Sequence, residues 1–313
     1  MANEGNLKPI RTKSEAREKG KKGGKKSGEV RAQRKTLREE LIALLETKIE
    51  DKTIQEKISF SLIQEAISGN VKAFETIRDT IGENLPTPVS FQKDSWSIIA
   101  ANEHDGNTSK YNVGDTKEVD LGTFGTHTVR IANKSECTNG ETSETACGFV
   151  VEFADIITNQ KFNSTNTNKG GWKDSELRTY INDTIYNSLP SDLQNVITTT
   201  KVISSHGKNS GETNFETKDK LYLLSTQEVW STNDSDTSVG TSKQLDYYKK
   251  RGVTLRDNRV EAMKKYNGIE EYWWLRSARS NNTDYFVYVD GAGVWGYFPA
   301  DGSNGVSPAF RIA

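Results

Sequence analysis

The sequence is poor in the residue types on which many catalytic and metal sites depend. Its 313 residues include two cysteines, three histidines and two methionines, and apolar residues make up 33%. His104, His127 and His206 are far apart, and none has a carboxylate or thiol at metal-ligand spacing. No Gly-x-Ser-x-Gly motif occurs, and the glycines of residues 20–28 lack the context of a phosphate loop. We therefore expect no catalytic residue, no metal, no cofactor and no enzymatic activity.

The chain also lacks long apolar runs. No stretch of 18 apolar residues occurs, and the N-terminus has no apolar centre of a secretory signal, so we expect synthesis in the cytoplasm without a signal peptide or membrane insertion. Cys137 and Cys147 lie ten positions apart in a loop rich in Thr, Ser, Asn and Gly. In the cytosol two reduced thiols are the prediction, and a loop-closing disulfide is the alternative for a protein that ends up outside a cell.

The net charge of −1 hides a strong asymmetry. Residues 1–35 hold twelve Lys or Arg against four Glu, a local charge of +8 that leaves −9 for the rest of the chain. With few apolar side chains to bury, this segment is predicted to be a disordered basic arm. It is either a solubilising tail or, as an alternative function, a DNA-binding segment, because mobile Lys and Arg neutralise phosphates. The candidate DNA contacts are Lys19, Lys21, Lys22, Lys25, Lys26 and Arg31.

Helix signals follow the basic arm. Thr36-Leu37-Arg38-Glu39 is a capping box, and apolar residues recur at helical spacing in three segments that end near Gly82. We expect three helices over residues 36–83, too short a unit to be stable without self-association or a partner. Pro86 and Pro88 predict a linker over residues 84–92.

From residue 93 to residue 313 the pattern of short strands with inserted helices predicts an α+β domain. We expect strands at residues 95–100, 117–121, 127–132, 149–157, 201–205 and 220–225. We expect helices at residues 174–187, 190–196, 226–230 and 260–266. Structural ion pairs or hydrogen bonds are the prediction for charged residues in these apolar elements, namely Glu152, Asp155, Arg178, Arg276 and Arg311.

The C-terminal segment has an apolar opening, an apolar close and a polar, aromatic interior over residues 278–304. The Tyr, Asn, Ser, Asp and Gly of the interior are typical of a binding surface. Trp273 and Trp274 in the opening are expected in the core. Glycines around Trp295 predict turns rather than a continuous strand, with Tyr288, Trp295 and Tyr297 as exposed anchors. Further ligand contacts are expected from Arg279, Asn281, Asn282, Asp284, Asp290, Asp301, Ser303 and Asn304.

Several motifs between residues 96 and 312 resemble a C-type-lectin-like domain of unknown function from bacterial and phage proteins. They include Gly170-Gly171-Trp172, Tyr180-Ile181-Asn182, Glu228-Val229-Trp230, Tyr272-Trp273-Trp274-Leu275-Arg276-Ser277 and Gly305-Val306-Ser307-Pro308-Ala309-Phe310-Arg311-Ile312, with shorter matches in residues 113–116, 129–133, 148–153 and 221–225. The group includes the variable proteins of diversity-generating retroelements, whose C-terminal segment is rewritten by adenine-directed mutagenic reverse transcription. The resemblance implies a ligand-binding phage or prophage protein with a hypervariable surface over residues 278–304, a protein or cell-surface ligand, and association with a virion.

Three further features of the sequence bear on this expectation. Lys22-Gly23-Gly24, Ser27-Gly28-Glu29 and residues 69–74 resemble a phage small terminase-like subunit, which implies the DNA-binding alternative. The paired active-site cysteines of the formylglycine-generating relatives of the lectin fold are missing from the C-terminal segment. No Glu-Pro-Asn or Gln-Pro-Asp triplet occurs, so calcium-dependent sugar binding is not expected.

Overall fold

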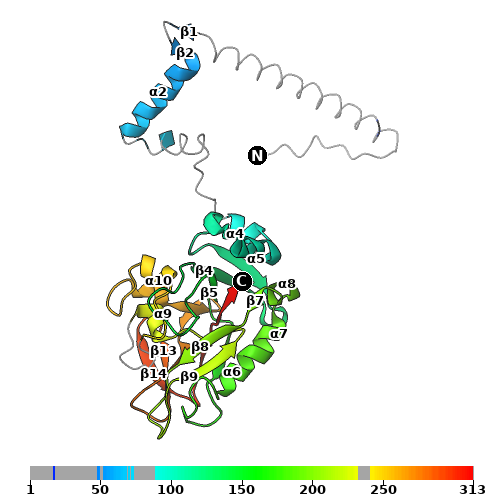
Figure 1. The fold of residues 1–313 in the computed structure, drawn as a ribbon, viewed down its shortest axis with the longest axis vertical. Helices are drawn as coiled ribbons and strands as arrows, with labels where there is room; N and C mark the ends of the chain where they lie inside the picture. The colour runs from blue at the N-terminus through cyan, green and yellow to red at the C-terminus, as the bar shows by residue number, and fades with distance from the viewer. Residues whose placement is uncertain are drawn as a thin grey trace, which may run out of the picture. The chain divides into compact units, whose positions relative to one another are not determined.

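The computed structural model describes residues 17, 48–49, 52–68, 70, 72–73, 89–231 and 240–312, in two units that comprise Met1–Asn84 and Leu85–Ala313 (Figure 1). The predicted DNA contacts of the basic arm lie outside the described residues, as do most of the first and third predicted helices. Among the helices that the structure describes, none is long and apolar enough to cross a membrane.

The described part of the first unit is one helix with a short antiparallel hairpin before it. Helix α2 spans Ile54–Ile67, which confirms the middle one of the three predicted helices. The hairpin pairs β1, Lys48–Ile49, with β2, Lys52–Thr53, where only helices were expected. Ile58, Phe60 and Ile63 of α2 are exposed, so this helix presents apolar side chains to its surroundings.

The second unit is α+β, as expected, and its first sheet is antiparallel throughout. The strand order is β3-β4-β5-β16-β7. The strands are β3 (Thr116–Asp120), β4 (Thr126–Asn133), β5 (Val150–Phe153), β16 (Ala309–Ile312) and β7 (Ile197–Thr198). Three of the expected strands are thereby confirmed. The close of the C-terminal segment is β16, which pairs with β5 and β7 and so lies inside the sheet.

The second sheet holds most of the C-terminal segment, in the order β14-β13-β12-β15-β6. Its strands are β12 (Trp273–Ala278), β13 (Tyr285–Val289), β14 (Trp295–Pro299), β15 (Ser303–Val306) and β6 (Thr158–Lys161). Every residue of β12 is buried, including Trp273 and Trp274, as predicted. The expected turns around Trp295 are wrong, because the chain reverses earlier, at Gly293 with φ 72°, and β14 then pairs with β13 over five residues.

Helices cover these sheets at several points (Figure 1). The predicted helix at 174–187 is confirmed as α6 (Glu176–Tyr180), a π-helical turn (Ile181–Ile185) and α7 (Tyr186–Ser188). The helices predicted at 190–196 and 226–230 are α8 (Ser191–Gln194) and α9 (Thr226–Trp230). Three more helices were not predicted: α4 (Val89–Lys93), where a linker was expected, α5 (Trp96–His104) and α10 (Asp246–Lys250).

Three expected elements are wrong, each for a local reason. Residues 95–100 begin helix α5 rather than a strand, because the Ser95 hydroxyl accepts the Ile98 N–H as an N-cap. Residues 220–225 form only an isolated bridge from Tyr222 to Ala309, and the strand paired with β8 (Thr200–Ser204) is instead β9 (Phe215–Asp219). Residues 260–266 divide into a 3-10 turn (Arg259–Ala262) and β10 (Lys264–Tyr266), which pairs with β11 (Ile269–Glu271).

Cys137 and Cys147 form a disulfide, with Cα atoms 5.1 Å apart. The prediction of two reduced thiols is therefore wrong, and the alternative of a loop-closing bond holds. The loop folds back because it is hydrogen-bonded to the rest of the domain: Ser143 N–H donates to Thr241 O at 2.7 Å and Glu144 N–H to Lys201 O at 2.8 Å. These bonds fix the part of the loop just before Cys147, so that its sulfur atom lies next to that of Cys137.

Candidate ligand-binding surface

One side of the β13–β14 hairpin carries a row of aromatic side chains. Val287 lies opposite Tyr297 and Val289 lies opposite Trp295, so these four side chains point to the same side of the sheet. The two valines are fully buried, whereas Trp295 and Tyr297 are half-buried, with ring centroids 5.0 Å apart. On this side of the hairpin, the valine side chains of β13 are therefore buried, and the aromatic side chains of β14 are partly exposed to solvent.

Arg279 extends this row. Its guanidinium carbon lies 3.9 Å from the ring centroid of Tyr297 and 5.8 Å from that of Tyr285, which are cation–π distances. Its Nε is buried without a hydrogen-bond partner, and no carboxylate in the described ranges pairs with it. A guanidinium held by rings but not neutralised can receive a carboxylate or an aromatic group. We call Arg279, Tyr285, Trp295 and Tyr297 the aromatic face.

Tyr288, the third expected anchor, lies on the opposite side of the hairpin. It faces Gly296 in the register, stacks on Tyr272 at 5.1 Å between centroids, and meets the edge of Phe298 at 6.1 Å. A Cβ at Gly296 would come within 2.5 Å of the Tyr288 hydroxyl, so the glycine makes room for this ring. Tyr288 is therefore not brought together with Trp295 and Tyr297.

Three of the expected polar contacts already accept hydrogen bonds within the protein, and two of them, Asn282 and Asp290, shape the backbone. Asn282 Oδ1 accepts hydrogen bonds from the N–H groups of Asp284 and Tyr285, at 2.7 and 2.9 Å. Asp290 Oδ1 accepts from the N–H groups of Ala292 and Val294 in the hairpin turn. Asp284 Oδ2 accepts from Asn166 Nδ2 at 3.1 Å. Asn282 and Asp290 stabilise turns, and the oxygens named here are already occupied.

The remaining expected contacts divide into exposed and buried positions. Asn281 and Asp301 are exposed in loops and Ser303 is exposed at the start of β15, where a ligand can reach them. Asn304 is only 6% exposed, so its expected role as a rim contact is wrong. The reason is topological: β15 lies between β12 and β6, and Asn304 pairs with Gln160 inside the sheet.

A residue outside the C-terminal segment holds the loop that carries Arg279. Asn168 is fully buried, and its Nδ2 donates to the carbonyl oxygens of Asn282 and Tyr285, both at 3.0 Å. Its Oδ1 accepts from Asn209 Nδ2 at 2.9 Å, so one amide joins three loops. Asn168 was not among the residues predicted from the sequence, because its place in an Asn- and Thr-rich run before Gly170-Gly171 is typical of an exposed loop.

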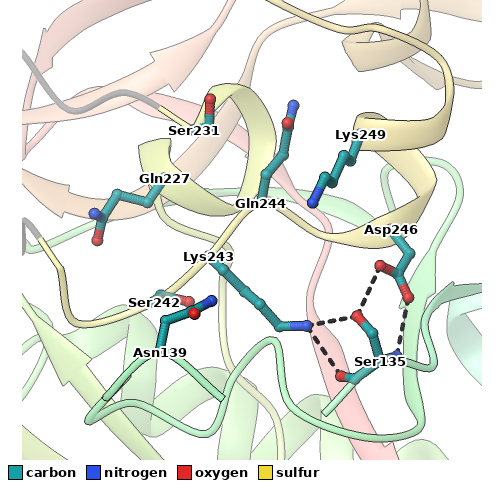
Figure 2. Close-up of a pocket in the computed structure, with 9 residues that line it drawn as sticks. All are labelled: Ser135, Asn139, Gln227, Ser231, Ser242, Lys243, Gln244, Asp246 and Lys249. Carbon is teal, nitrogen blue, oxygen red and sulfur yellow. Dashed lines mark hydrogen bonds between the residues drawn. The ribbon is translucent and has the colours of Figure 1, made fainter. Parts of the chain in front are cut away.

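A polar pocket of about 350 Å³ lies beside α9 and α10, away from the residues of the aromatic face (Figure 2). Its wall is braced by Asp246, which accepts hydrogen bonds from the Lys134 N–H, the Ser135 N–H and the Ser135 hydroxyl. Although burial favours the neutral acid, these bonds hold the pKa of Asp246 below its ordinary value. Lys243 Nζ donates to Ser135 O at 3.0 Å and to its hydroxyl at 2.5 Å.

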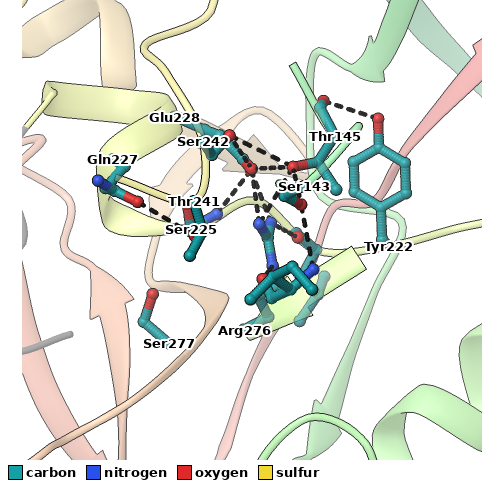
Figure 3. Close-up of polar contacts among 12 residues, drawn as sticks. Ser143, Thr145, Tyr222, Ser225, Gln227, Glu228, Thr241, Ser242, Arg276 and Ser277 are labelled. Carbon is teal, nitrogen blue, oxygen red and sulfur yellow. Dashed lines mark hydrogen bonds and ion pairs between the residues drawn. The ribbon is translucent and has the colours of Figure 1, made fainter. Parts of the chain in front are cut away.

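A buried ion pair fixes the opening of the C-terminal segment to α9 (Figure 3). Arg276 donates in bidentate fashion to Glu228, with both N···O distances 2.6 Å, and both side chains are at most 1% exposed. Glu228 also accepts from the hydroxyls of Thr145 and Ser242 and from the Ser225 N–H. Burial disfavours the carboxylate, but attraction to Arg276 and these hydrogen bonds hold the pKa of Glu228 below its ordinary value.

A second buried cluster, centred on Glu152 of β5, joins this strand to β4, β10 and α10. Its carboxylate pairs with Arg130 at 2.9 Å and with Lys264 at 2.8 Å, and it accepts the Tyr248 hydroxyl at 3.0 Å. Burial lowers the pKa of Lys264 to about 8. The other charged residues expected in structural roles also have partners: Arg178 with Asp219, Arg311 with Glu144, and Asp155 with the Lys265 N–H. That prediction is confirmed.

The second unit is thus an α+β domain with the aromatic face on its edge hairpin, β13–β14, and with two buried charge clusters. The family described as "Domain of unknown function (DUF6273)" matches residues 150–313, more than half of the chain, and the protein belongs to this family. Comparisons with curated proteins and with solved structures found no match. The family region runs from β5 to the C-terminus and includes the aromatic face, Asn168, Glu228 and Arg276, while the disulfide lies before it.

Proposed function

We propose that this protein is a non-enzymatic ligand-binding protein of a phage or prophage, with a C-type-lectin-like domain that displays a variable surface on residues 278–304. The observation that carries the proposal is the aromatic face, where half-buried Trp295 and Tyr297 lie side by side and the guanidinium of Arg279, which has no ion pair among the described residues, lies over the Tyr297 ring. Large aromatic side chains and arginine are the residues that dominate binding energy in protein interfaces.

The attachment of this face supports the idea that its side chains can be exchanged. Next to β13 in the sheet, β12 is fully buried and pairs with β15, which in turn pairs with β6. The loop that carries Arg279 is held by the side chain of Asn168. The bonds that fix the backbone therefore come largely from residues outside the face. A rigid scaffold with a separately variable surface is the arrangement that a diversified binding protein needs.

The proposal predicts that the protein tolerates substitutions in the aromatic face better than substitutions of the buried residues of β13. We would randomise Arg279, Trp295 and Tyr297 together in one library and, as a matched control, Phe286, Val287 and Val289 in another. The first library should retain mostly folded members, from which binders to an arbitrary protein such as lysozyme can be selected; the control library should lose folded members. Equal loss of folding in both libraries would contradict an exchangeable surface.

The diversification itself is tested in the DNA. Under the proposal, a near-identical repeat of the region that encodes residues 273–312 lies close to the gene, differs from it only at adenines, and is followed by a reverse transcriptase. Differences at other bases would argue for ordinary divergence, and the ligand-binding part of the proposal would then stand without the retroelement.

A further inference from the structure

The polar pocket beside α9 and α10 is lined by more positive than negative side chains. Lys243 and Lys249 line it together with one carboxylate, Asp246 (Figure 2). The oxygens of Asp246 point into the Ser135 wall and already accept three hydrogen bonds, so this carboxylate braces the pocket rather than offering an acceptor. The groups left to face a ligand are the ammonium groups. Burial lowers the pKa of Lys243, so an anion placed beside it would relieve an unfavourable desolvated charge.

Among the residues that the structure describes, the other charges near the pocket do not cancel the lysines. Glu141 attracts Lys243, but its carboxylate is engaged by the N–H and side chain of Asn139. Glu136 also attracts Lys243 without lining the pocket. Lys249 is exposed at the end of α10 and forms no ion pair in the described stretches of the chain. A third N–H of Lys243 and the whole ammonium of Lys249 are therefore available as donors.

Gln244 also lines the pocket and carries a neutral acceptor. Gln244 Nε2 donates to Val229 O and to Val253 O, both at 2.8 Å. These bonds use both amide hydrogens, so Oε1 is the amide atom that remains to accept a hydrogen bond. A carbonyl oxygen repels a bare anion but accepts a hydrogen bond from a hydroxyl group. Serine hydroxyls that line the pocket can donate or accept further hydrogen bonds. One of these serines, Ser231, has a left-handed backbone conformation, φ 59°, which is uncommon outside glycine.

We propose that this pocket binds a small hydroxylated anion, a sugar ring that carries a carboxylate or a phosphate. The acid group pairs with Lys243 and Lys249, and a ring hydroxyl donates to Gln244 Oε1. Charge-assisted hydrogen bonds to lysine supply the stronger contacts, and the amide selects against anions without hydroxyl groups. The volume of about 350 Å³ lies within the usual range for small-molecule sites. No residue of the pocket belongs to the aromatic face, so the inference does not rest on the proposed function.

The test is isothermal titration calorimetry on the full chain with glucuronate, glucose 6-phosphate, glucose and inorganic phosphate at fixed ionic strength. At least one of the two sugar acids should bind about tenfold more tightly than both glucose and inorganic phosphate, and the stronger one identifies the acid group. Lys249→Gln should weaken that binding about tenfold and Lys249→Glu further, because position 249 is exposed and its substitution leaves the fold intact.

Lys218→Glu is the matched control, since Lys218 is an exposed lysine of β9 that does not line the pocket. It should bind the sugar acid as the unsubstituted protein does, and so should Trp295→Ala. Three results would overturn the proposal: no binding of either sugar acid at concentrations on the order of 10 mM, equal binding of inorganic phosphate, or equal losses in Lys249→Glu and Lys218→Glu.

Discussion

The buried Glu228–Arg276 pair gives the sharpest prediction about stability. Glu228→Gln keeps the size of the side chain but removes the charge that faces Arg276 in a bidentate pair with both distances 2.6 Å. The guanidinium would then be buried without a counter-charge, since both side chains are at most 1% exposed. Breaking a buried pair by removing one partner costs about 3–5 kcal/mol, and we expect a loss of unfolding free energy in that range.

The measurement is urea unfolding followed by near-ultraviolet circular dichroism, supported by thermal melts. For a domain of this size the expected loss corresponds to a decrease in Tm of roughly 6–20 °C. Glu216→Gln is the matched control, because Glu216 and Lys201 form an ion pair whose side chains are 54% and 37% exposed. We expect that control to lie within about 0.5 kcal/mol of the unsubstituted protein, as exposed pairs contribute little.

The pH dependence of the unfolding free energy distinguishes the effect of removing the Glu228 charge from the effect of altering side-chain packing. The pKa of Glu228 is held below its ordinary value in the folded protein, so its contribution is fully present above the unfolded pKa of about 4.3 and is lost as the pH falls through the lower folded value. The difference between Glu228→Gln and the unsubstituted protein should therefore shrink in acid. A loss under about 1 kcal/mol at pH 7, or a difference that does not change with pH, would refute the reasoning.

Two further predictions concern how the surfaces are held. The Cys137→Ser, Cys147→Ser double variant should lose about 2.7 kcal/mol in urea unfolding, from the entropy of a loop with a sequence separation of 10, and reducing the unsubstituted protein should have the same effect. Asn168→Ala should cost roughly 2–4 kcal/mol, because it removes three buried hydrogen bonds, and hydrogen exchange should rise in residues 279–285 more than in β16. Equal exchange in both regions would show that Asn168 does not hold that loop.

Local patterns in the sequence predicted the elements that local interactions determine. Strand β4 has a local run rich in β-branched residues, helix α9 has a capping box formed by Ser225 and Glu228 in the structure, and both elements formed where expected. The apolar opening was correctly assigned to the core because two adjacent tryptophans in a strand without glycine or proline have few other places to lie. The N-cap of α5 is also local, but Ser95 was overlooked beside the β-like composition of the residues that follow it.

The candidate site could be predicted only in part, because its geometry depends on long-range contacts. Asn168 acts on carbonyl groups 114 and 117 positions away, and no spacing in the sequence indicates that. Tyr288 and Tyr297 are both tyrosines in a polar, aromatic segment and were predicted to be exposed together, but the strand register places them on opposite sides of the hairpin. The disulfide was left as an alternative because two cysteines at this spacing fit either state, and the fold of the loop between them decided it.

The polar residues of the C-terminal segment therefore have two separable roles, and this limits which positions can vary. Asn282 and Asp290 accept backbone hydrogen bonds that form turns, so their replacement changes the path of the chain as well as its surface. Asn304 is buried within the sheet, and a larger side chain there has no space to enter. Variation that preserves the fold is expected to concentrate on the positions that are exposed or half-buried and hold no turn, namely Arg279, Asn281, Trp295, Tyr297, Asp301 and Ser303.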